Sequence, residues 1–213
     1  MPPQPGLLRT LSEDLAVVVA RDPSLTGRRE ALGHTGLSAL WAHRVAHRLY
    51  GRGLRTAART VARVARRRTG VEIHPGAVLG RRVFIDHGAS VVIGQTAVVG
   101  DDVTIYQQVT LGAVGWWTDN RRPPGARRHP VVGNGVVLGA NATVLGPVTV
   151  GDHALIGAMA TVTEDLPPGA RVYAPRSVVR PAPGLRPVGD ATGLAGPPGT
   201  PDAVRILAST GSW

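Results

Sequence analysis

A branched aliphatic residue recurs at every sixth position over much of this chain of 213 residues. Small residues such as Gly133 and Gly139 often follow it directly. The longest run is Val132, Leu138, Val144, Val150, Ile156 and Val162, and shorter runs are Ile73, Leu79 and Ile85, then Ile93, Val99, Ile105 and Leu111. Neither a helix nor a strand has a six-residue period. The repeat therefore predicts a solenoid, in which each unit buries its apolar residue by stacking on its neighbours.

The composition fits narrow coils with an aliphatic interior. The chain has 28 glycines and 18 prolines, but only four Trp, three Tyr and one Phe. Its net charge is +10, and because lysine is absent, all 24 basic residues are arginine. A nucleic-acid binder has such a balance, as does a protein that binds a ligand with several phosphates. We favour a third explanation, the replacement of Lys by Arg in a GC-rich genome, and expect no nucleic-acid partner.

The absence of cysteine excludes disulfides, thiolate metal sites and a cysteine nucleophile. The N-terminus lacks the basic and then apolar pattern of a signal peptide, and no segment reaches about 18 apolar residues. These features predict a soluble cytoplasmic protein with no membrane segment.

The chain is expected to have three parts. Residues 1–69 form a helical segment, with helices at about 7–20, 35–50 and 54–68. Residues 70–180 hold the repeats, and 181–213 form an irregular Pro/Gly-rich tail. The second helix should bury one apolar stripe, and the third should expose its arginines to solvent. The stripe is Leu37, Leu40, Trp41, Val45 and Leu49, and the arginines are Arg55, Arg59, Arg63 and Arg66.

Two breaks in the repeat are candidate sites of function, because rigid coils hold the base of a loop in place. The spacing slips by two residues between Ile85 and Ile93, and residues 112–130 leave the solenoid as a loop. Glu72 and His87 lie slightly less than one coil apart in the sequence and would approach each other if both faced one groove. A carboxylate bonded to one imidazole nitrogen lets the other act as a base. From spacing alone, a surface histidine beside unrelated acids is the stronger interpretation.

Several strings resemble the serine O-acetyltransferases of the hexapeptide-repeat acyltransferase superfamily. They are Val71-Glu72-Ile73-His74-Pro75, Ile85-Asp86-His87-Gly88, Gly94-Gln95-Thr96, Gln108-Val109-Thr110-Leu111-Gly112 and Arg128-His129-Pro130, with Arg21-Asp22-Pro23 upstream. The resemblance covers about residues 21–180. It implies a mainly β fold, a left-handed parallel β-helix, which is a rare exception to right-handed crossovers. It also implies homotrimers with active sites between subunits.

The resemblance also implies roles for individual residues. His87 would be the general base for direct transfer of an acetyl group from acetyl-CoA, a co-substrate, to a serine-like hydroxyl, with no metal and no tightly bound cofactor. Glu72 would orient His87, and His129 of an adjacent subunit would line the same site. The substrate's amino group would meet Asp22 and Asp86, and its carboxylate would meet Arg128. The residues implied for acetyl-CoA are Gly112, Ala113, Ala140 and Ala158.

The sequence departs from the family pattern near this site. Gln95 replaces the usual glutamate, Gly88-Ala89-Ser90 replaces Ala-Thr-Gly after His87, and the loop before Arg128 is longer and carries Trp116 and Trp117. These changes leave open whether the acceptor is serine or another hydroxyl amino acid, and whether the donor is acetyl-CoA or another acyl-CoA. The pathway is cysteine biosynthesis in the first case and specialised metabolism in the second.

Two other functions are weighed against acyl transfer. A zinc hydrase on the same scaffold needs clustered histidines, but the repeats lack a His-x4-His pair. A non-catalytic binding scaffold is disfavoured because the six residues implied for catalysis and amino-acid binding occur together. They are Asp22, Glu72, Asp86, His87, Arg128 and His129. Because the chain ends in Trp213 and not in isoleucine, and its helical segment is short, we expect no complex with the sulfhydrylase that makes cysteine, and a trimer in place of a hexamer.

Overall fold

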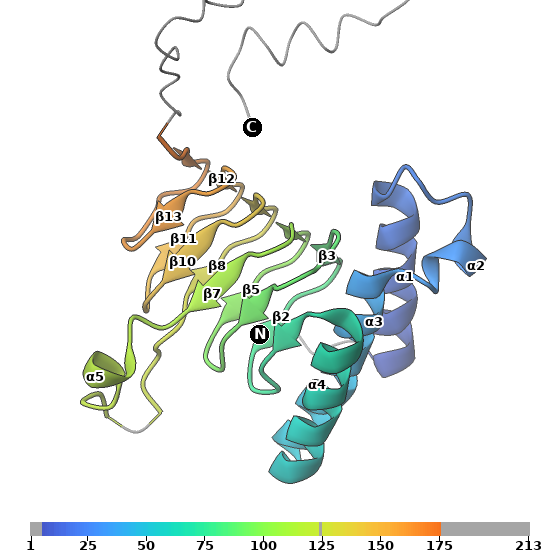
Figure 1. The fold of residues 1–213 in the computed structure, drawn as a ribbon, viewed down its shortest axis with the longest axis horizontal. Coiled ribbons are helices and arrows are strands. Elements are labelled where there is room, and N and C mark those ends of the chain that lie inside the picture. The colour runs from blue at the N-terminus through green and yellow to red at the C-terminus, as the bar shows by residue number, and fades with distance from the viewer. Residues whose placement is uncertain (1–5, 124, 176–213) are drawn as a thin grey trace, which may run out of the picture. The chain divides into compact units, whose positions relative to one another are not determined.

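The computed structural model describes residues 6–123 and 125–175. The chain divides into two units, Met1–Ala174 and Pro175–Trp213. The tail expected at 181–213, with Trp213, lies outside the described residues. Four helices precede the repeats: α1 (Leu7–Arg21), α2 (Arg28–Ala31), α3 (Thr35–Gly51) and α4 (Arg55–Thr69) (Figure 1). The helices predicted at 7–20, 35–50 and 54–68 are confirmed as α1, α3 and α4, and the short α2 is an addition.

The repeats form three parallel sheets, which we call A, B and C. Sheet A contains β1 (Glu72–Ile73), β4 (Val92–Ile93), β7 (Thr110–Gly112), β10 (Thr143–Leu145) and β13 (Thr161–Val162). Sheet B contains β11 (Thr149–Val150), β8 (Val131–Val132), β5 (Val98–Val99) and β2 (Val78–Leu79). Sheet C contains β14 (Arg171–Val172), β12 (Leu155–Ile156), β9 (Val137–Leu138), β6 (Thr104–Ile105) and β3 (Phe84–Ile85).

Successive strands enter the three sheets in rotation, so each strand pairs with the strand three places along the chain. A six-residue repeat thus consists of a short strand and the corner that leads to the next sheet. This arrangement explains why the sequence shows neither a helical nor a strand period.

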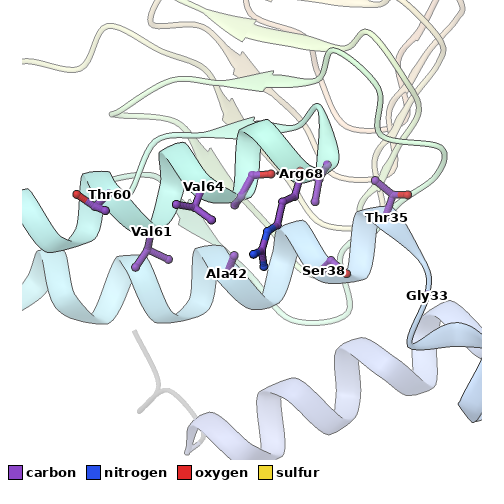
Figure 2. A pocket seen from close by; sticks show the side chains of 10 residues that line it. Gly33, Thr35, Ser38, Ala42, Thr60, Val61, Val64 and Arg68 are labelled. Atoms are coloured by element: carbon purple, nitrogen blue, oxygen red, sulfur yellow. Dashed lines mark hydrogen bonds between the residues drawn. The ribbon is translucent and has the colours of Figure 1, made fainter.

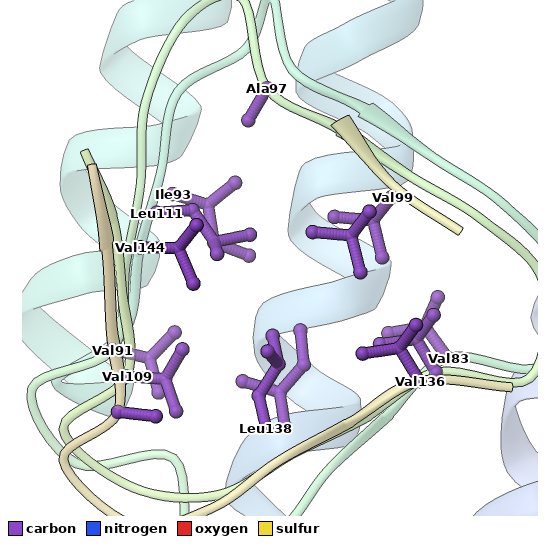
Figure 3. Close-up of a cluster of buried hydrophobic side chains, with 14 of the residues drawn as sticks. Val83, Val91, Ile93, Ala97, Val99, Val109, Leu111, Val136, Leu138 and Val144 are labelled. Atoms are coloured by element: carbon purple, nitrogen blue, oxygen red, sulfur yellow. The ribbon is translucent and has the colours of Figure 1, made fainter. Parts of the chain in front are cut away.

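The residues of the six-residue repeat form the core, as predicted. All of them, from Ile73 to Val162, are between 0% and 6% exposed. Figure 3 shows a part of this core, in which Ile93, Leu111 and Val144 lie one above another. A second buried residue lies two positions before most of them, and this second row was not expected from the sequence. It consists of Val71, Ala77, Val83, Val91, Ala97, Val103, Val109, Val136, Ala142, Val148, Ala154 and Ala160. Each repeat therefore buries two side chains, and full burial of a valine or leucine contributes about 1.5–3 kcal/mol.

The small residues after the buried aliphatics allow the coils to stack closely. A Cβ added to Gly139 would lie 2.6 Å from the backbone nitrogen of Ala158 in the adjacent coil. Adjacent parallel strands lie about 4.8 Å apart. A side chain at this position would therefore separate the two coils.

Coil length varies at two places without disturbing the strand pairing. Glu72 pairs with Val92, and Val92 pairs with Thr110, so the first coil is two residues longer than the second. Thr110 pairs with Thr143, which makes the third coil nearly twice as long as the second. The additional residues are the slip after Ile85 and the loop that begins after β7, so both predicted breaks in the repeat lie in corners.

The buried face of α3 differs from the predicted stripe. Leu37 and Leu40 are buried, but Val45 is 40% exposed, and His43 and Arg44 are buried instead. Arg44 bonds both carboxylate oxygens of Asp14 in α1, each at 3.2 Å, and donates to the carbonyls of Leu79 and Gly80, each at 2.7 Å. The helix turns this face inward because Arg44 satisfies the carbonyls at and just beyond the end of the edge strand β2.

The outer face of α4 agrees with the prediction. Its exposed arginines include Arg55, Arg59, Arg63 and Arg66. Gly70 adopts the left-handed conformation (φ 71°) that ends this helix. Within residues 6–123 and 125–175, no helix combines the length and hydropathy that a bilayer span requires.

Candidate active site

His87 lies on what we call the His87 corner (residues 86–91, between β3 and β4). Its φ is 58°, in the left-handed region that a residue with a side chain seldom adopts. The imidazole is 72% exposed, and its Nε2 lies 3.9 Å from Oδ1 of Asp86. The corner after β3 thus presents an exposed imidazole beside a carboxylate. The same backbone conformation recurs at other corners, for example at Asn141 and His153, so it belongs to the geometry of the corners.

Asp22, the residue that follows α1, lies near the His87 corner. Its Oδ1 accepts hydrogen bonds from the backbone nitrogen of Ser24 (2.9 Å) and from Ser24 Oγ (2.6 Å). These bonds lower the pKa of the Asp22 carboxyl, and the nearby imidazoles of His34 and His87 lower it further. The structure therefore brings together Asp22, Asp86 and His87, three of the six residues predicted to bind or activate the amino acid.

Glu72 has a different partner from the one predicted. Its Oε2 lies 3.0 Å from Nη1 of Arg66 in the last turn of α4. No hydrogen bond between Glu72 and His87 occurs among the described residues. Arg66 reaches Glu72 because α4 lies along β1, where a groove of about 330 Å³ is lined by Arg59, Ala62, Arg63, Arg66, Glu72, Ile73, His74 and Pro75.

Arg128 and His129 lie on the opposite edge of sheet A, on what we call the His129 corner (residues 94–97 and 126–130). Thr96 organises it: its Oγ1 accepts from the backbone nitrogens of Arg128 (2.9 Å) and His129 (3.1 Å). The same oxygen lies 2.8 Å from Nδ1 of His129. With two donors already bound, the Thr96 hydroxyl donates its proton to Nδ1, which leaves the ring proton of His129 on Nε2.

His129 is buried in a space that Gly94 provides. A Cβ added to Gly94 would overlap the His129 ring. Burial lowers the pKa of His129 below its ordinary value, the charge of Arg128 lowers it further, and Asp119 opposes the change. The ring is thus a fixed, mainly neutral donor near neutral pH.

Gln95 joins Arg128 to the helices. Its Oε1 accepts from Nη2 of Arg128 at 2.8 Å, and its Nε2 donates to the hydroxyl of Tyr50 at 3.2 Å. Arg55 also donates to that hydroxyl at 3.0 Å and lies over the Tyr50 ring. The amide oxygen thus accepts from Arg128 without placing a negative charge beside the guanidinium.

The extruded loop contains a short helix, α5 (Trp116–Asp119). Asp119, the last residue of α5, is buried and accepts from the backbone nitrogen of Gly115 (3.3 Å) and from Nε of Arg122 (3.2 Å). Trp116 and Trp117 are 73% and 57% exposed. A pocket of about 310 Å³ under the loop is lined by Gln95, Thr96, Asp119, Asn120, Arg122, Pro123, Gly125, Ala126 and Arg128.

The residues predicted to meet acetyl-CoA divide between the two sides of sheet A. Gly112 and Ala113 lie where β7 leads into the extruded loop. Ala140 and Ala158 follow β9 and β12, and the backbone nitrogen of Met159 donates to the carbonyl of Ala140 at 2.8 Å. The strands of sheet A therefore separate the His87 corner from the His129 corner within one chain.

A groove between two helices and the exposed His153 do not belong to this site. A groove of about 480 Å³ between α3 and α4, lined by residues such as Ala42, Val61 and Val64, contains none of the predicted site residues (Figure 2). Within the described part of the chain, no three His, Asp or Glu side chains gather as a metal site would need. His153 lies apart from the other histidines, in the corner between β11 and β12.

Sequence reasoning missed Ser24, His34, Tyr50 and Thr96. Only Thr96 had a local signal, since it belongs to the motif Gly94-Gln95-Thr96. The other three act through contacts between segments that are distant in the sequence or through a turn after α1, and no spacing reveals them.

Comparison with known proteins gives consistent matches. The family model for the bacterial transferase hexapeptide (six repeats) matches residues 129–164. Serine acetyltransferase from Mycobacterium tuberculosis is 46% identical over 183 residues, which cover 84% of this chain and 77% of the relative. Serine acetyltransferase from Helicobacter pylori is 48% identical over 161 residues, covering 75% of this chain and 90% of the relative.

Solved structures agree with these matches. Neisseria gonorrhoeae serine acetyltransferase in complex with serine is 37% identical with a TM-score of 0.71, covering 79% of this chain and 66% of that one. Entamoeba histolytica serine acetyltransferase 1 in complex with L-cysteine is 39% identical with a TM-score of 0.74, covering 79% and 63%. The chain thus spans about two thirds of the length of these solved proteins.

Proposed function

The chain belongs to the serine acetyltransferase family, and on that premise we propose that it transfers the acetyl group of acetyl-CoA to the hydroxyl of L-serine. The repeats would form a left-handed parallel β-helix, and three chains would assemble so that the His87 corner of one faces the His129 corner of the next. The rotation of strands through three sheets supports the coil, and membership of the family supports its hand and the trimer.

One observation carries the proposal. The exposed imidazole of His87 lies beside the carboxylate of Asp86 and is close enough to Asp22 to lower the pKa of that carboxyl, while Arg128 and the neutral imidazole of His129 lie at the other edge of the same sheet. In an oligomer, the His87 corner of one chain would lie against the His129 corner of another. The charges of the two corners would then be complementary to those of an amino acid. The carboxylates face its ammonium, Arg128 faces its carboxylate, and His87 faces its hydroxyl.

The reaction then needs only that the two substrates be held in position and that one residue act first as general base and then as general acid. His87 takes the proton of the serine hydroxyl as the oxygen attacks the thioester carbonyl of acetyl-CoA. The tetrahedral intermediate collapses with cleavage of the C–S bond, and the imidazolium returns the proton to the CoA sulfur. The products are O-acetylserine and CoA, and no acyl-enzyme forms.

Glu72 would influence His87 from the neighbouring strand. Arg66 holds its carboxylate in the free chain, and we propose that the carboxylate turns to the imidazole when substrate is bound and stabilises the imidazolium. The acetyl-CoA arm would lie between copies, along Gly112 and Ala113 of one chain and Ala140 and Ala158 of the next.

A second acceptor is favoured by one observation, the exposed Trp116 and Trp117 on the loop that carries Arg128. If this loop covers the acceptor pocket, a larger or differently shaped hydroxyl amino acid would fit there. Release of CoA from acetyl-CoA with L-serine, L-homoserine and D-serine distinguishes the two. A clear preference for L-serine supports the main proposal, and a preference for another acceptor supports the alternative.

His87→Ala tests the mechanism. We expect turnover to fall at least about 100-fold, the usual contribution of a general base, while the oligomer measured by light scattering stays intact. His153→Ala is the matched control, because His153 is also an exposed histidine in the left-handed conformation (φ 58°), at a corner outside the site. Equal turnover in the His87 variant and the wild type would rule out the base.

A further inference from the structure

His34 lies just before α3, and two contacts fix the orientation of its ring. Its Nδ1 accepts a hydrogen bond from the backbone nitrogen of Leu37 at 3.2 Å, so the side chain caps the helix. The ring stacks on Phe84, with centroids 5.9 Å apart and planes at 29°. Because Nδ1 is the acceptor, the ring proton is on Nε2.

The Nε2–H group of His34 faces the carboxylate of Asp22. Nε2 lies 3.8 Å from Oδ2, with only 10% of the His34 side chain and 16% of the Asp22 side chain exposed. Ser24 occupies the other oxygen, Oδ1, with two donors. The two oxygens of Asp22 therefore have different surroundings, and only Oδ2 keeps most of its acceptor capacity.

We infer that His34 is a positioning residue for the acceptor: it holds Asp22 so that Oδ2 faces the substrate's ammonium at the His87 corner. The inference rests on the proposed function. The separation of Nε2 and Oδ2 is longer than a hydrogen bond. The interaction therefore orients the carboxylate through the N–H dipole and leaves Oδ2 free for a cation. An arginine in this place would pair with Asp22 and compete with the ammonium.

The packing links this contact to the base. Phe84, on which His34 stacks, belongs to β3, and His87 follows that strand two residues later. The start of α3 also packs closely on β3, since a Cβ on Gly36 would overlap the Ile85 carbonyl. His34 therefore fixes Asp22 relative to the strand that presents His87, so the groups for the ammonium and for the hydroxyl keep one spacing.

Two substitutions separate capping from positioning. In His34→Asn, the amide oxygen replaces Nδ1 as the cap, because asparagine is a preferred N-cap, but nothing replaces Nε2. In His34→Gln, the longer amide places an N–H group near the position of Nε2, but the cap is lost. Both variants are assayed as full-length oligomers for kcat, for the KM of each substrate and for the melting temperature.

For His34→Asn we expect the KM for L-serine to rise by about three- to tenfold, the size of a modest polar interaction. Its kcat and its KM for acetyl-CoA should stay close to those of the wild type, and its melting temperature should fall only by the amount that the lost stack on Phe84 contributes. His34→Gln should melt at a lower temperature yet keep a KM for L-serine near the wild-type value. If His34 had only a structural role, the variant with the lower melting temperature would also have the higher KM for L-serine. We expect the opposite.

Other outcomes contradict the inference. If His34→Asn leaves the KM for L-serine unchanged, or if the KM follows the melting temperature in both variants, His34 is only a cap. These results would leave the proposed function intact, because the wild type would still release CoA with L-serine. A wild type that shows no such turnover overturns the proposed function and the inference with it.

Discussion

Gly94 and His129 share a space that has no room for even one more carbon atom. Gly94 directly follows β4, and a Cβ added there would overlap the imidazole. Its φ lies outside the left-handed region, so an alanine costs nothing in backbone strain. The position of one imidazole in the site thus depends on the absence of a single methyl group in the neighbouring coil.

Gly94→Ala should therefore displace His129 and abolish most turnover. We expect the free energy of unfolding to fall by about 1–3 kcal/mol, as for other overpacked cores. The double variant Gly94→Ala, His129→Ala removes the overlap, so its stability should return toward that of His129→Ala alone while turnover stays low. Urea unfolding of the four proteins measures the coupling. Additive changes in free energy would show that the two residues do not collide.

At the scale of helices and strands, ion pairs and hydrogen bonds from helix side chains to backbone carbonyls attach the helical segment to the first coil. Arg44 of α3 bonds the carbonyls of Leu79 and Gly80, and Nδ1 of His47 donates to the carbonyl of Pro75 at 2.8 Å. Arg81 bonds Glu13 of α1 at 2.6 and 2.9 Å. The helices in this way cover the first strands of the stack, whose edges would otherwise be open for pairing with another chain.

The Glu13–Arg81 pair predicts how stability depends on acid. The hydrogen bonds from Arg81 lower the pKa of Glu13 from 4.5 to about 2. A lowered carboxyl pKa contributes stability that is fully present above the unfolded value of 4.5 and is lost as the pH falls through about 2. The stability difference between the wild type and Glu13→Gln should be constant at neutral pH, shrink below pH 4.5 and vanish near pH 2.

Unfolding of both proteins in urea from neutral pH to about pH 2 measures this difference. Glu164→Gln serves as the control, because Glu164 is exposed and forms no ion pair among the described residues. A difference for Glu13→Gln that persists unchanged at the acid end of this range would contradict the assignment.

Periodic features of the fold were predictable from the sequence, and pairwise contacts were not. The six-residue spacing identified the buried residues because each coil repeats the same environment. The face of α3 was predicted wrongly at Val45, since no spacing shows that Arg44 will find Asp14 and be buried. Likewise, motifs in the sequence named His87 and His129 as candidate residues, but the contacts of His34 with Asp22 and of Thr96 with His129 join segments that no motif connects.

At the scale of the whole molecule, the opposite positions of the His87 and His129 corners on sheet A predict a site shared between chains. His87→Ala and His129→Ala should each be nearly inactive when expressed alone. When the two are co-expressed in equal amounts, about a quarter of the sites in random trimers would combine an intact His87 with an intact His129. Turnover should therefore return to about a quarter of the wild-type value.

The control is co-expression of His87→Ala with the double variant His87→Ala, His129→Ala, in which every chain lacks the base. This mixture should stay inactive. If the first mixture also stays inactive while mass measurement shows mixed trimers, each chain carries its own complete site, and the shared arrangement is wrong.

The unequal coil lengths have a consequence for how such proteins diversify. Glu72, Val92, Thr110 and Thr143 stay in register although the coils that separate successive members differ in length. A corner can therefore gain or lose residues while the strands on either side keep their partners. Chemistry and architecture can therefore vary independently in such a molecule, because a longer corner adds side chains without changing which strands pair.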